Sequence, residues 1–208
     1  MGKLQSNFFL RDTLTVAADL LGRYLVRNID GQLLVCRITE TEAYIGAIDK
    51  ACHAYGGKVT PRTKTLYAPP GTVYVYLIYG MYCCVNFVTE PEGTASAVLI
   101  RGAVPVYNGN TIAQARFGKD ISSLSAYQRK NFLNGPGKLC KGMFIDRSMN
   151  NTSCGDSTLY IADEIPELGL FCRSDDFSYC TGKRIGIDYA EEAIDFPWRF
   201  WTKEDSQC

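Results

Sequence analysis

Hydrophobic and polar positions alternate along several stretches of the chain, which is the pattern of half-buried β-strands. The pair Asp30-Gly31 between the first two stretches is typical of a two-residue hairpin turn. A second turn is indicated at Tyr79-Gly80, within a run rich in Val, Ile, Tyr and Phe. The predicted strands are residues 23–29, 32–44, two strands within 72–88, 95–104 and 184–187, followed by an aromatic terminal element at 197–201.

Apolar residues recur at helical spacing in segments that flank these strands. Thr13 or Thr15 is the candidate N-cap of the first helix, and Gly22 ends it. Further helices are predicted at residues 110–117, 123–133 and 138–144, the last after Gly135-Pro136-Gly137, and glycines and prolines mark 52–70 as a loop. Clustered strands with flanking helices indicate an α+β fold with a mainly antiparallel sheet, and residues 1–208 are expected to form a single domain.

The composition is that of a globular protein, with 46% hydrophobic and 21% charged residues. No apolar run is long enough to predict a membrane-spanning helix, and the N-terminus lacks the apolar segment of a signal peptide. Gly2 and Ser6 match only a short, common myristoylation pattern. The nine cysteines include no C-x-x-C pair, which favours reduced thiols in a cytosolic protein, and the single histidine argues against a metal site.

Positive and negative residues balance at 22 each. A neutral chain is less suited than a basic one to binding phosphates, but the distribution of charge matters more than its sum. Lys58, Arg62 and Lys64 lie in the predicted loop without an acid between them, whereas acids concentrate at residues 156–167 and 188–195. The sequence is therefore compatible with a basic face and a separate acidic face.

The first candidate for acid–base chemistry is the pentapeptide from Glu40 to Tyr44. Because alternate side chains of a strand share a face, Glu40, Glu42 and Tyr44 should point the same way. A carboxylate beside aromatic rings and out of bulk water has a raised pKa and can act as a base near neutral pH. A solvated strand face is the alternative interpretation of the same residues.

The second predicted hairpin has one aliphatic and one phenolic face. Val73 and Val75 suit a core, while Tyr74 and Tyr76 on the opposite face present flat rings with polar tips. Tyr79 should project from the turn, where an exposed aromatic side chain can wedge into a base stack. An inert tyrosine at a hairpin tip is equally consistent with this pattern.

Three isolated polar residues each leave two interpretations open. His53 is either a functional group in the loop that follows the acidic strand or an ordinary surface or core histidine. Asn86 lies in an apolar run and needs partners, so it either caps a local backbone group or lines a polar pocket. Arg101, at the end of the run Val98–Arg101, anchors a phosphate or pairs with a carboxylate.

Taken in chain order, these residues resemble the alkyladenine (3-methyladenine) DNA glycosylase family. Each matching block is short, but together the blocks are specific and span nearly the whole chain. They are Glu40-Thr41-Glu42-Ala43-Tyr44, His53, Thr60-Pro61-Arg62, Pro70-Gly71-Thr72, Tyr74-Val75-Tyr76, Ile78-Tyr79-Gly80-Met81-Tyr82, Asn86, Gly135-Pro136, Lys138-Leu139-Cys140, Arg184-Ile185-Gly186-Ile187 and Pro197-Trp198-Arg199-Phe200. Residues 150–176 match poorly, and we assign them no function.

The resemblance implies a role for each matching residue of the site. Glu42 corresponds to the general base that activates the hydrolytic water, and Arg101 to a neighbour that positions the water or a phosphate. Asn86 corresponds to a pocket residue that disfavours normal guanine through its exocyclic amine. The walls that hold the flipped base correspond to Tyr44, His53 and Tyr76.

The resemblance also implies how the protein meets DNA. Tyr79 corresponds to the side chain that enters the minor groove and fills the gap left by the extruded nucleotide. The DNA-contacting loop corresponds to the stretch with Lys58, Thr60 and Arg62. The implied protein is a compact α+β domain with a curved sheet and a protruding β-hairpin. It is expected to be a monomer without a cofactor or metal that acts on double-stranded DNA containing damaged purines. Its expected location is the cytoplasm, with association to the nucleoid in a bacterium, or the nucleus in a eukaryote.

The function implied by the resemblance is that of a monofunctional DNA glycosylase that flips and excises alkylated or deaminated purines. Expected substrates are 3-methyladenine and 7-methylguanine, with hypoxanthine and ethenoadenine as further candidates, and water attacks the anomeric carbon at the start of base excision repair. Two rivals remain. A carbohydrate hydrolase would use Glu40 and Glu42, although carboxylates on one strand face rarely flank a sugar. A non-catalytic binder of damaged DNA would use Tyr79 and the loop cations.

Overall fold

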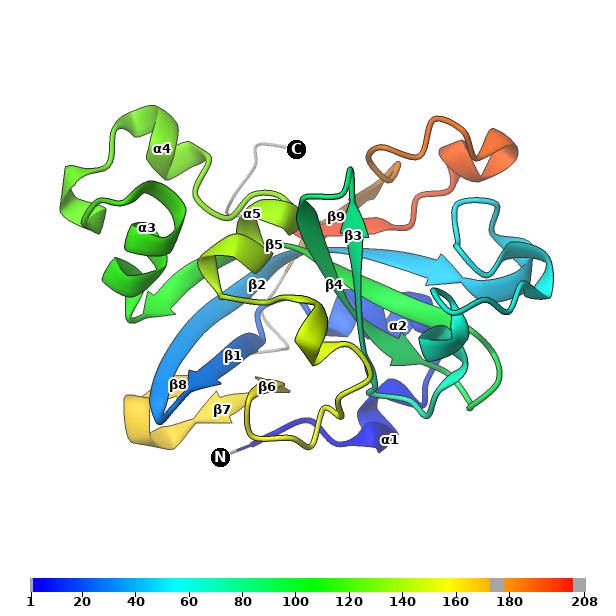
Figure 1. Ribbon diagram of the computed structural model, residues 1–208, viewed down its shortest axis with the longest axis horizontal. Helices are drawn as coiled ribbons and strands as arrows, with labels where there is room; N and C mark the ends of the chain where they lie inside the picture. Colours follow the sequence, from blue (N-terminus) through cyan, green and yellow to red (C-terminus); the bar gives the residue numbers. More distant parts are fainter. Residues whose placement is uncertain (1, 173–177, 204–208) are drawn as a thin grey trace.

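A curved antiparallel sheet runs through the molecule (Figure 1). The computed structural model describes residues 2–172 and 178–203. Within these residues, eight strands form the sheet in the order β3-β4-β5-β2-β1-β6, with β10 beside β2 and β9 beside β10. The strands are β1 (Tyr24–Ile29), β2 (Gln32–Ile45), β3 (Val73–Ile78), β4 (Tyr82–Thr89), β5 (Ser96–Tyr107), β6 (Leu159–Ala162), β9 (Tyr179–Gly182) and β10 (Arg199–Thr202), and a separate pair is formed by β7 (Glu164–Ile165) and β8 (Leu170–Phe171).

Short helices flank this sheet, so the predicted α+β class is confirmed. In Figure 1, α3 and α4 lie together at one end of the sheet, and the β3–β4 hairpin projects upward from it. The α-helices are α1 (Ser6–Phe9), α2 (Thr13–Asp19), α3 (Gly109–Phe117), α4 (Ala126–Lys130) and α5 (Pro136–Gly142). The 3-10 helices are η1 (Gly46–Ile48), η2 (Tyr55–Gly57), η3 (Lys64–Tyr67), η4 (Ile121–Ser123), η5 (Arg147–Met149), η6 (Pro166–Leu168) and η8 (Glu191–Asp195).

Both predicted hairpin turns are present. Asp30 and Gly31 have φ angles of 50° and 91°, and Tyr79 and Gly80 have φ angles of 51° and 68°. Two successive left-handed residues are the requirement of a type I′ turn, whose twist matches that of the strands it joins. The turn at Tyr79 therefore places a non-glycine residue in a conformation that glycine, asparagine or aspartate adopts more readily.

Several predicted helix boundaries are wrong. The N-cap of α2 is Asp12, whose carboxylate accepts a hydrogen bond from the Thr15 backbone N–H, so neither Thr13 nor Thr15 caps the helix. The helix predicted at 123–133 is limited to α4, because the Ser125–Gln128 capping box starts a new helix there. The helix predicted at 138–144 is α5, which begins at Pro136 because proline needs no hydrogen-bond partner at the first helical position.

The C-terminal part departs further from the predictions. Residues 184–187 are not a strand: Gly186 has a φ of 75°, and the segment bends over the sheet instead of joining it. The aromatic element predicted at 197–201 overlaps strand β10, which extends one residue further to Thr202. Strands β6, β7, β8 and β9 were not predicted, and the first three lie in the segment 150–176, whose residues 173–176 are outside the described residues.

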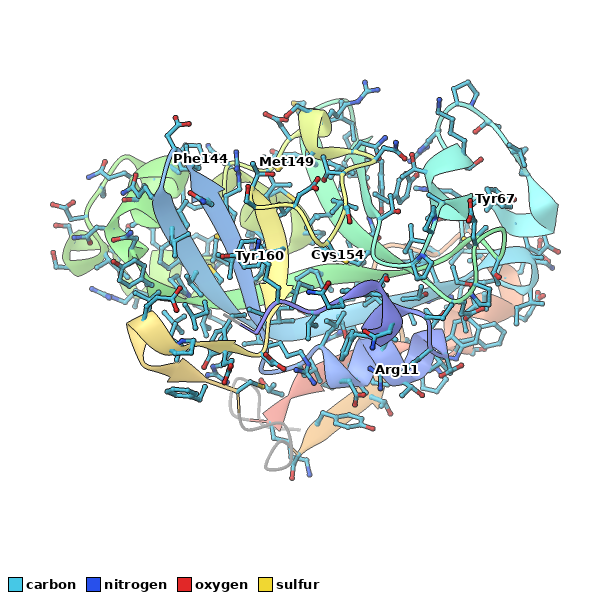
Figure 2. The ribbon with its side chains drawn as sticks, turned by 90° about the horizontal axis from the view of Figure 1, so that it is seen from below. Arg11, Tyr67, Phe144, Met149, Cys154 and Tyr160 are labelled. Carbon is cyan, nitrogen blue, oxygen red and sulfur yellow. The ribbon has the colours of Figure 1, made fainter. Side chains whose placement is uncertain are left out.

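The main core lies on one face of the sheet, under α1 and α2. Figure 2 looks from this side, where the core residues Met149 and Cys154 are labelled. Phe9 of α1 stacks on Phe87 of β4 with ring centroids 5.5 Å apart. On the predicted aliphatic face of β3, Val73 and Val75 are buried in this core, whereas the third member, Leu77, is only half-buried and lines the cavity side.

Two bulges in the β2–β5 ladder exchange the faces of both strands. Ile38 pairs with Ala103, Glu40 with Gly102 and Thr41 with Ile100, so Thr39 and Arg101 are extra residues. Before its bulge β2 faces the core with Leu34, Cys36 and Ile38, and after it with Thr41 and Ala43. The bulges therefore turn Glu40, Glu42, Tyr44 and Arg101 to the face opposite the core.

In the described part of the chain, no helix is long and apolar enough to cross a membrane. Seven cysteines there are free thiols, five of them buried. Cys180 is disulfide-bonded, so the expectation of reduced cysteines is wrong for this residue, which is only partly buried on edge strand β9.

Candidate active site

A cavity of about 510 Å³ opens on the face of the sheet opposite the main core. Strands β2, β3, β4 and β5 form its floor, because their alternate side chains point away from the core. The segment from Ala51 to Leu66 and the segment from Ile185 to Tyr189 close it from the sides. Eight residues assigned from the sequence meet here: Glu42, Tyr44, His53, Arg62, Tyr76, Tyr79, Asn86 and Arg101.

Glu42 lies at the floor of the cavity and is fully buried. Its Oε1 accepts a hydrogen bond of 2.9 Å from the Ile185 backbone N–H, and its Oε2 accepts one of 2.8 Å from the Tyr44 hydroxyl. Arg101 Nε lies 3.6 Å from Oε1. Burial raises the pKa of Glu42 above its ordinary value, although Arg101 and the two hydrogen bonds act to lower it.

Glu40 has a different environment from Glu42, although both point to the same side of β2. Its Oε1 lies 2.9 Å from Arg101 Nε and 2.7 Å from Arg199 Nε. Two guanidinium groups therefore neutralise Glu40, and this residue does not line the cavity. Only one of the two carboxylates considered for sugar hydrolysis faces the cavity, which removes the support for a carbohydrate hydrolase.

Aromatic rings form one wall of the cavity. The rings of His53 and Tyr76 meet edge to face with centroids 4.6 Å apart, and those of Tyr74 and Tyr76 lie 5.3 Å apart. The Arg62 guanidinium lies over the Tyr76 ring at 5.2 Å. Burial raises the pKa values of the Tyr44 and Tyr76 phenols well above the ordinary range, so both remain neutral hydrogen-bond donors.

His53 is held in a defined neutral form. Its Nε2 lies 3.0 Å from Arg62 Nη2, which can only donate, so Nε2 is the acceptor. Its Nδ1, 3.0 Å from the Tyr74 hydroxyl, then carries the proton and donates it. Burial, with the nearby Arg62 charge, lowers the pKa of His53 to about 4. The ring is therefore uncharged at neutral pH.

Asn86 combines the two roles left open for it. Its Nδ2 donates a hydrogen bond of 3.0 Å to the Tyr74 carbonyl of the paired strand, and its side chain lines the cavity. It is only 3% exposed. This hydrogen bond holds the amide in place in the wall of the cavity.

The hairpin tip stands beside the cavity mouth. Tyr79 is 86% exposed, and Met81 is 72% exposed. Tyr79 also lines the cavity. An exposed aromatic side chain on a hairpin turn beside a pocket has a shape suited to wedge into a base stack, which stays a prediction for Tyr79.

The loop residues are divided between two environments. Arg62 turns into the cavity, as its contacts with His53 and Tyr76 show. Thr60 is part of a local turn with Thr63, and the Lys58 carbonyl accepts a hydrogen bond from the Thr63 hydroxyl. Lys58 and Thr60 do not line the cavity, so contact with DNA outside it stays a prediction for them.

The residues missed by the sequence reasoning lie in the segment predicted as a strand. The Ile185 N–H binds Glu42, and the neighbouring Arg184 is buried against Asp49. Gly186, with its left-handed backbone, was the signal in the sequence that could have indicated a bend. As for metals, residues 2–172 and 178–203 contain no group of three or more His, Cys, Asp or Glu side chains able to hold an ion.

Comparisons with known proteins identify the family of this chain. Residues 7–206 match the family model of methylpurine-DNA glycosylase. A relative from Clostridium perfringens is 52% identical over 98% of this chain and 97% of its own length. A second relative, from Desulfitobacterium hafniense, is 49% identical over 100% of this chain and 98% of its own length. Both are named as 3-methyladenine DNA glycosylases. This chain belongs to the methylpurine-DNA glycosylase family.

Proposed function

We propose that this protein is a monofunctional glycosylase that flips alkylated or deaminated purines out of DNA and hydrolyses their bond to deoxyribose. The family makes the chain a hydrolase of N-glycosyl bonds in DNA. The single observation that most supports hydrolysis by water is Glu42, a fully buried carboxylate at the floor of a cavity with aromatic walls. Water attack at the anomeric carbon requires such a base.

Glu42 would act on a water molecule between its carboxylate and the sugar. Its raised pKa makes it a stronger base than an exposed glutamate, and the nearby Arg101 charge favours its ionised form. Departure of the purine leaves positive charge on the sugar, as in the hydrolysis of glycosides. The same carboxylate would stabilise this charge.

The aromatic wall suits a cationic purine. Methylation of adenine N3 or guanine N7 gives the base a positive charge, which an aromatic face attracts by about 1–2 kcal/mol. His53 is neutral at physiological pH and does not repel it. The charge also weakens the glycosidic bond, whereas hypoxanthine and ethenoadenine would need more assistance from the site. Asn86, fixed on the Tyr74 carbonyl, would disfavour guanine through its exocyclic amine.

Water is the proposed nucleophile in place of an amine. Among the described residues that line the cavity there is no lysine, which supports base release without a Schiff base or strand cleavage. The substrate is proposed to be double-stranded DNA, because a base of a duplex must leave the stack before it can enter an enclosed site with Glu42 at its floor. The relatives named above are bacterial, so we place the reaction on the chromosome in the bacterial cytoplasm, with the protein as a monomer.

The test is base release from two end-labelled substrates, a duplex with one hypoxanthine and a methylated duplex, each analysed with and without alkali. We expect strand breaks only after alkali, because a monofunctional enzyme leaves an intact abasic strand. Breaks without alkali would contradict water as the nucleophile. Lesion binding without release would instead indicate a damage-binding module, and release from methylated DNA alone would narrow the substrate range.

A further inference from the structure

Arg184 is a fully buried cation that connects three parts of the chain. Its Nη1 and Nη2 pair with the two carboxylate oxygens of Asp49, and both side chains are 0% exposed. Nη1 also donates to the Ala43 carbonyl at 2.8 Å, and Nη2 to the Ala193 carbonyl at 3.2 Å. The guanidinium thus joins β2, the loop after it and the segment that contains η8.

The same guanidinium is stacked between two aromatic rings. Its Cζ lies 4.7 Å from the centroid of Tyr44 and 5.1 Å from that of Trp198. Arginine suits such a position because its charge is planar and delocalised. The contact restricts the Tyr44 ring, whose hydroxyl donates to Glu42 Oε2.

The residue after Arg184 holds the other oxygen of Glu42. The Ile185 N–H donates to Oε1 at 2.9 Å from a segment that belongs to neither a helix nor a strand. No ladder in the described residues fixes this N–H, so its position depends on side-chain contacts of the segment. Ile187 packs in a small apolar cluster, and Arg184, the residue next to Ile185, supplies the buried polar contacts.

We propose that Arg184, anchored on Asp49, is a positioning residue that presents Tyr44 and the Ile185 N–H to the two oxygens of Glu42. This inference rests on the proposed function, in which Glu42 is the base. The buried pair has no need to touch the substrate, and two apolar residues could give similar stability. Its geometric result is a carboxylate that cannot rotate away from the reacting sugar.

Loss of this arrangement should alter the titration of Glu42. The Ile185 N–H is one of the contacts that lower the pKa of this carboxyl, so its removal raises the pKa further. A base functions when deprotonated, and the acidic limb of the rate profile should therefore move to higher pH. The titratable and charged groups around Glu42 are Glu40 and Tyr44 on β2, Tyr76 on β3, Cys84 on β4 and Arg101 on β5. Of these, Tyr44 lies against Arg184 and is expected to move with it.

The experiment measures single-turnover release of 7-methylguanine as a function of pH with saturating enzyme. This base is already cationic, so protonation of the leaving group does not enter the profile. Two variants are compared with the wild type: Arg184→Lys, and replacement of Ile185 by its α-hydroxy acid, which converts only this amide to an ester. The same ester at Ile48, which is 68% exposed, is the matched control.

We expect both variants to release base about tenfold more slowly at neutral pH and to shift the acidic midpoint up by about one pH unit, the effect of one lost hydrogen bond to a charged group. Binding of lesion DNA and the control ester should stay close to the wild type. If Arg184→Lys does not fold, the Ile185 ester decides. An unchanged midpoint in a folded, active ester variant would overturn the inference while leaving Glu42 as the base. An inactive wild type would instead overturn the proposed function and the inference with it.

Discussion

At the scale of single residues, Glu42 combines complete burial with hydrogen bonds to both carboxylate oxygens. Burial alone would keep the group protonated, and donors alone would make it a weak base. The two effects oppose each other, and the pKa remains raised. A carboxylate with a raised pKa is a stronger base toward water than an exposed glutamate when it is deprotonated.

Glu42→Gln should abolish base release, because an amide cannot accept the proton of the attacking water. We expect a loss of at least about 100-fold in the single-turnover rate, as is usual for a general base. Affinity for lesion DNA should stay within about tenfold, since the Ile185 contact can persist. Glu92→Gln, at an exposed position between β4 and β5, is the control. Turnover close to that of the wild type would exclude Glu42 as the base.

His53 makes a prediction about stability and pH. Its folded pKa is lowered from 6.5 to about 4, so the unfolded chain binds more protons between these values. The free energy of unfolding should therefore fall as pH decreases from 6.5 towards 4. At pH 4.5 we expect His53 to lower it by about 1–3 kcal/mol relative to neutral pH. Urea unfolding at pH 7.5 and 4.5 should show a smaller loss for His53→Gln than for the wild type. Equal losses would mean that His53 is not held neutral.

At the scale of elements, the β3–β4 hairpin has two separate functions in one unit. Its alternate residues Val73 and Val75 anchor it in the core, and Tyr74 and Tyr76 form a wall of the cavity. The rigid anchoring allows its tip to bear an almost fully exposed Tyr79. The alternation was readable in the sequence because strand periodicity is local.

Tyr79→Ala should weaken binding of lesion DNA by about 1–3 kcal/mol, the usual contribution of a contact between a base and an aromatic side chain. The melting temperature should change little, since the side chain is 86% exposed. Tyr127→Ala on α4, where the tyrosine is 76% exposed, is the matched control and should bind as the wild type does. Equal affinities of the two variants would show that the hairpin tip does not enter the duplex.

The bulges of β2 and β5 are the elements that sequence periodicity could not locate. An uninterrupted β2 would place Glu40 and Glu42 on the same face as the core residues Cys36 and Ile38. The extra residue Thr39 reverses this assignment. The predicted convergence of Glu40, Glu42 and Tyr44 was correct because it used only the residues after the bulge.

At the scale of the whole molecule, the neutral net charge has to be reconciled with DNA as the substrate. Two cations of the cavity are engaged within the protein: Arg101 pairs with Glu40, and Arg62 contacts His53 and Tyr76. Neither is therefore placed to replace a counterion of the phosphates in this arrangement. Binding should therefore depend on the flipped base and the hairpin more than on charge.

Lys58→Gln should reduce the slope of the logarithm of the DNA association constant against the logarithm of salt concentration by about 1. It should weaken binding to damaged and undamaged duplexes equally. The physical reason is the loss of one phosphate contact that reads no base. Lys3→Gln is the control, because the Lys3 amine donates to the Asp156 carbonyl, and this variant should leave the slope unchanged. Identical slopes for Lys58→Gln and the wild type would place this loop away from the DNA.

The sequence by itself determined strands β1 to β5, both hairpin turns, the family resemblance and the residue types of the site, because periodicity, turn chemistry and motif order are properties of the local chain. Only the tertiary structure decided how these residues meet. Arg101 reaches Glu42 through a bulged register, and Arg184 pairs with Asp49 across 135 positions. The raised pKa of Glu42 likewise depends on burial by four strands and a bent segment, because desolvation is produced by everything packed around a group.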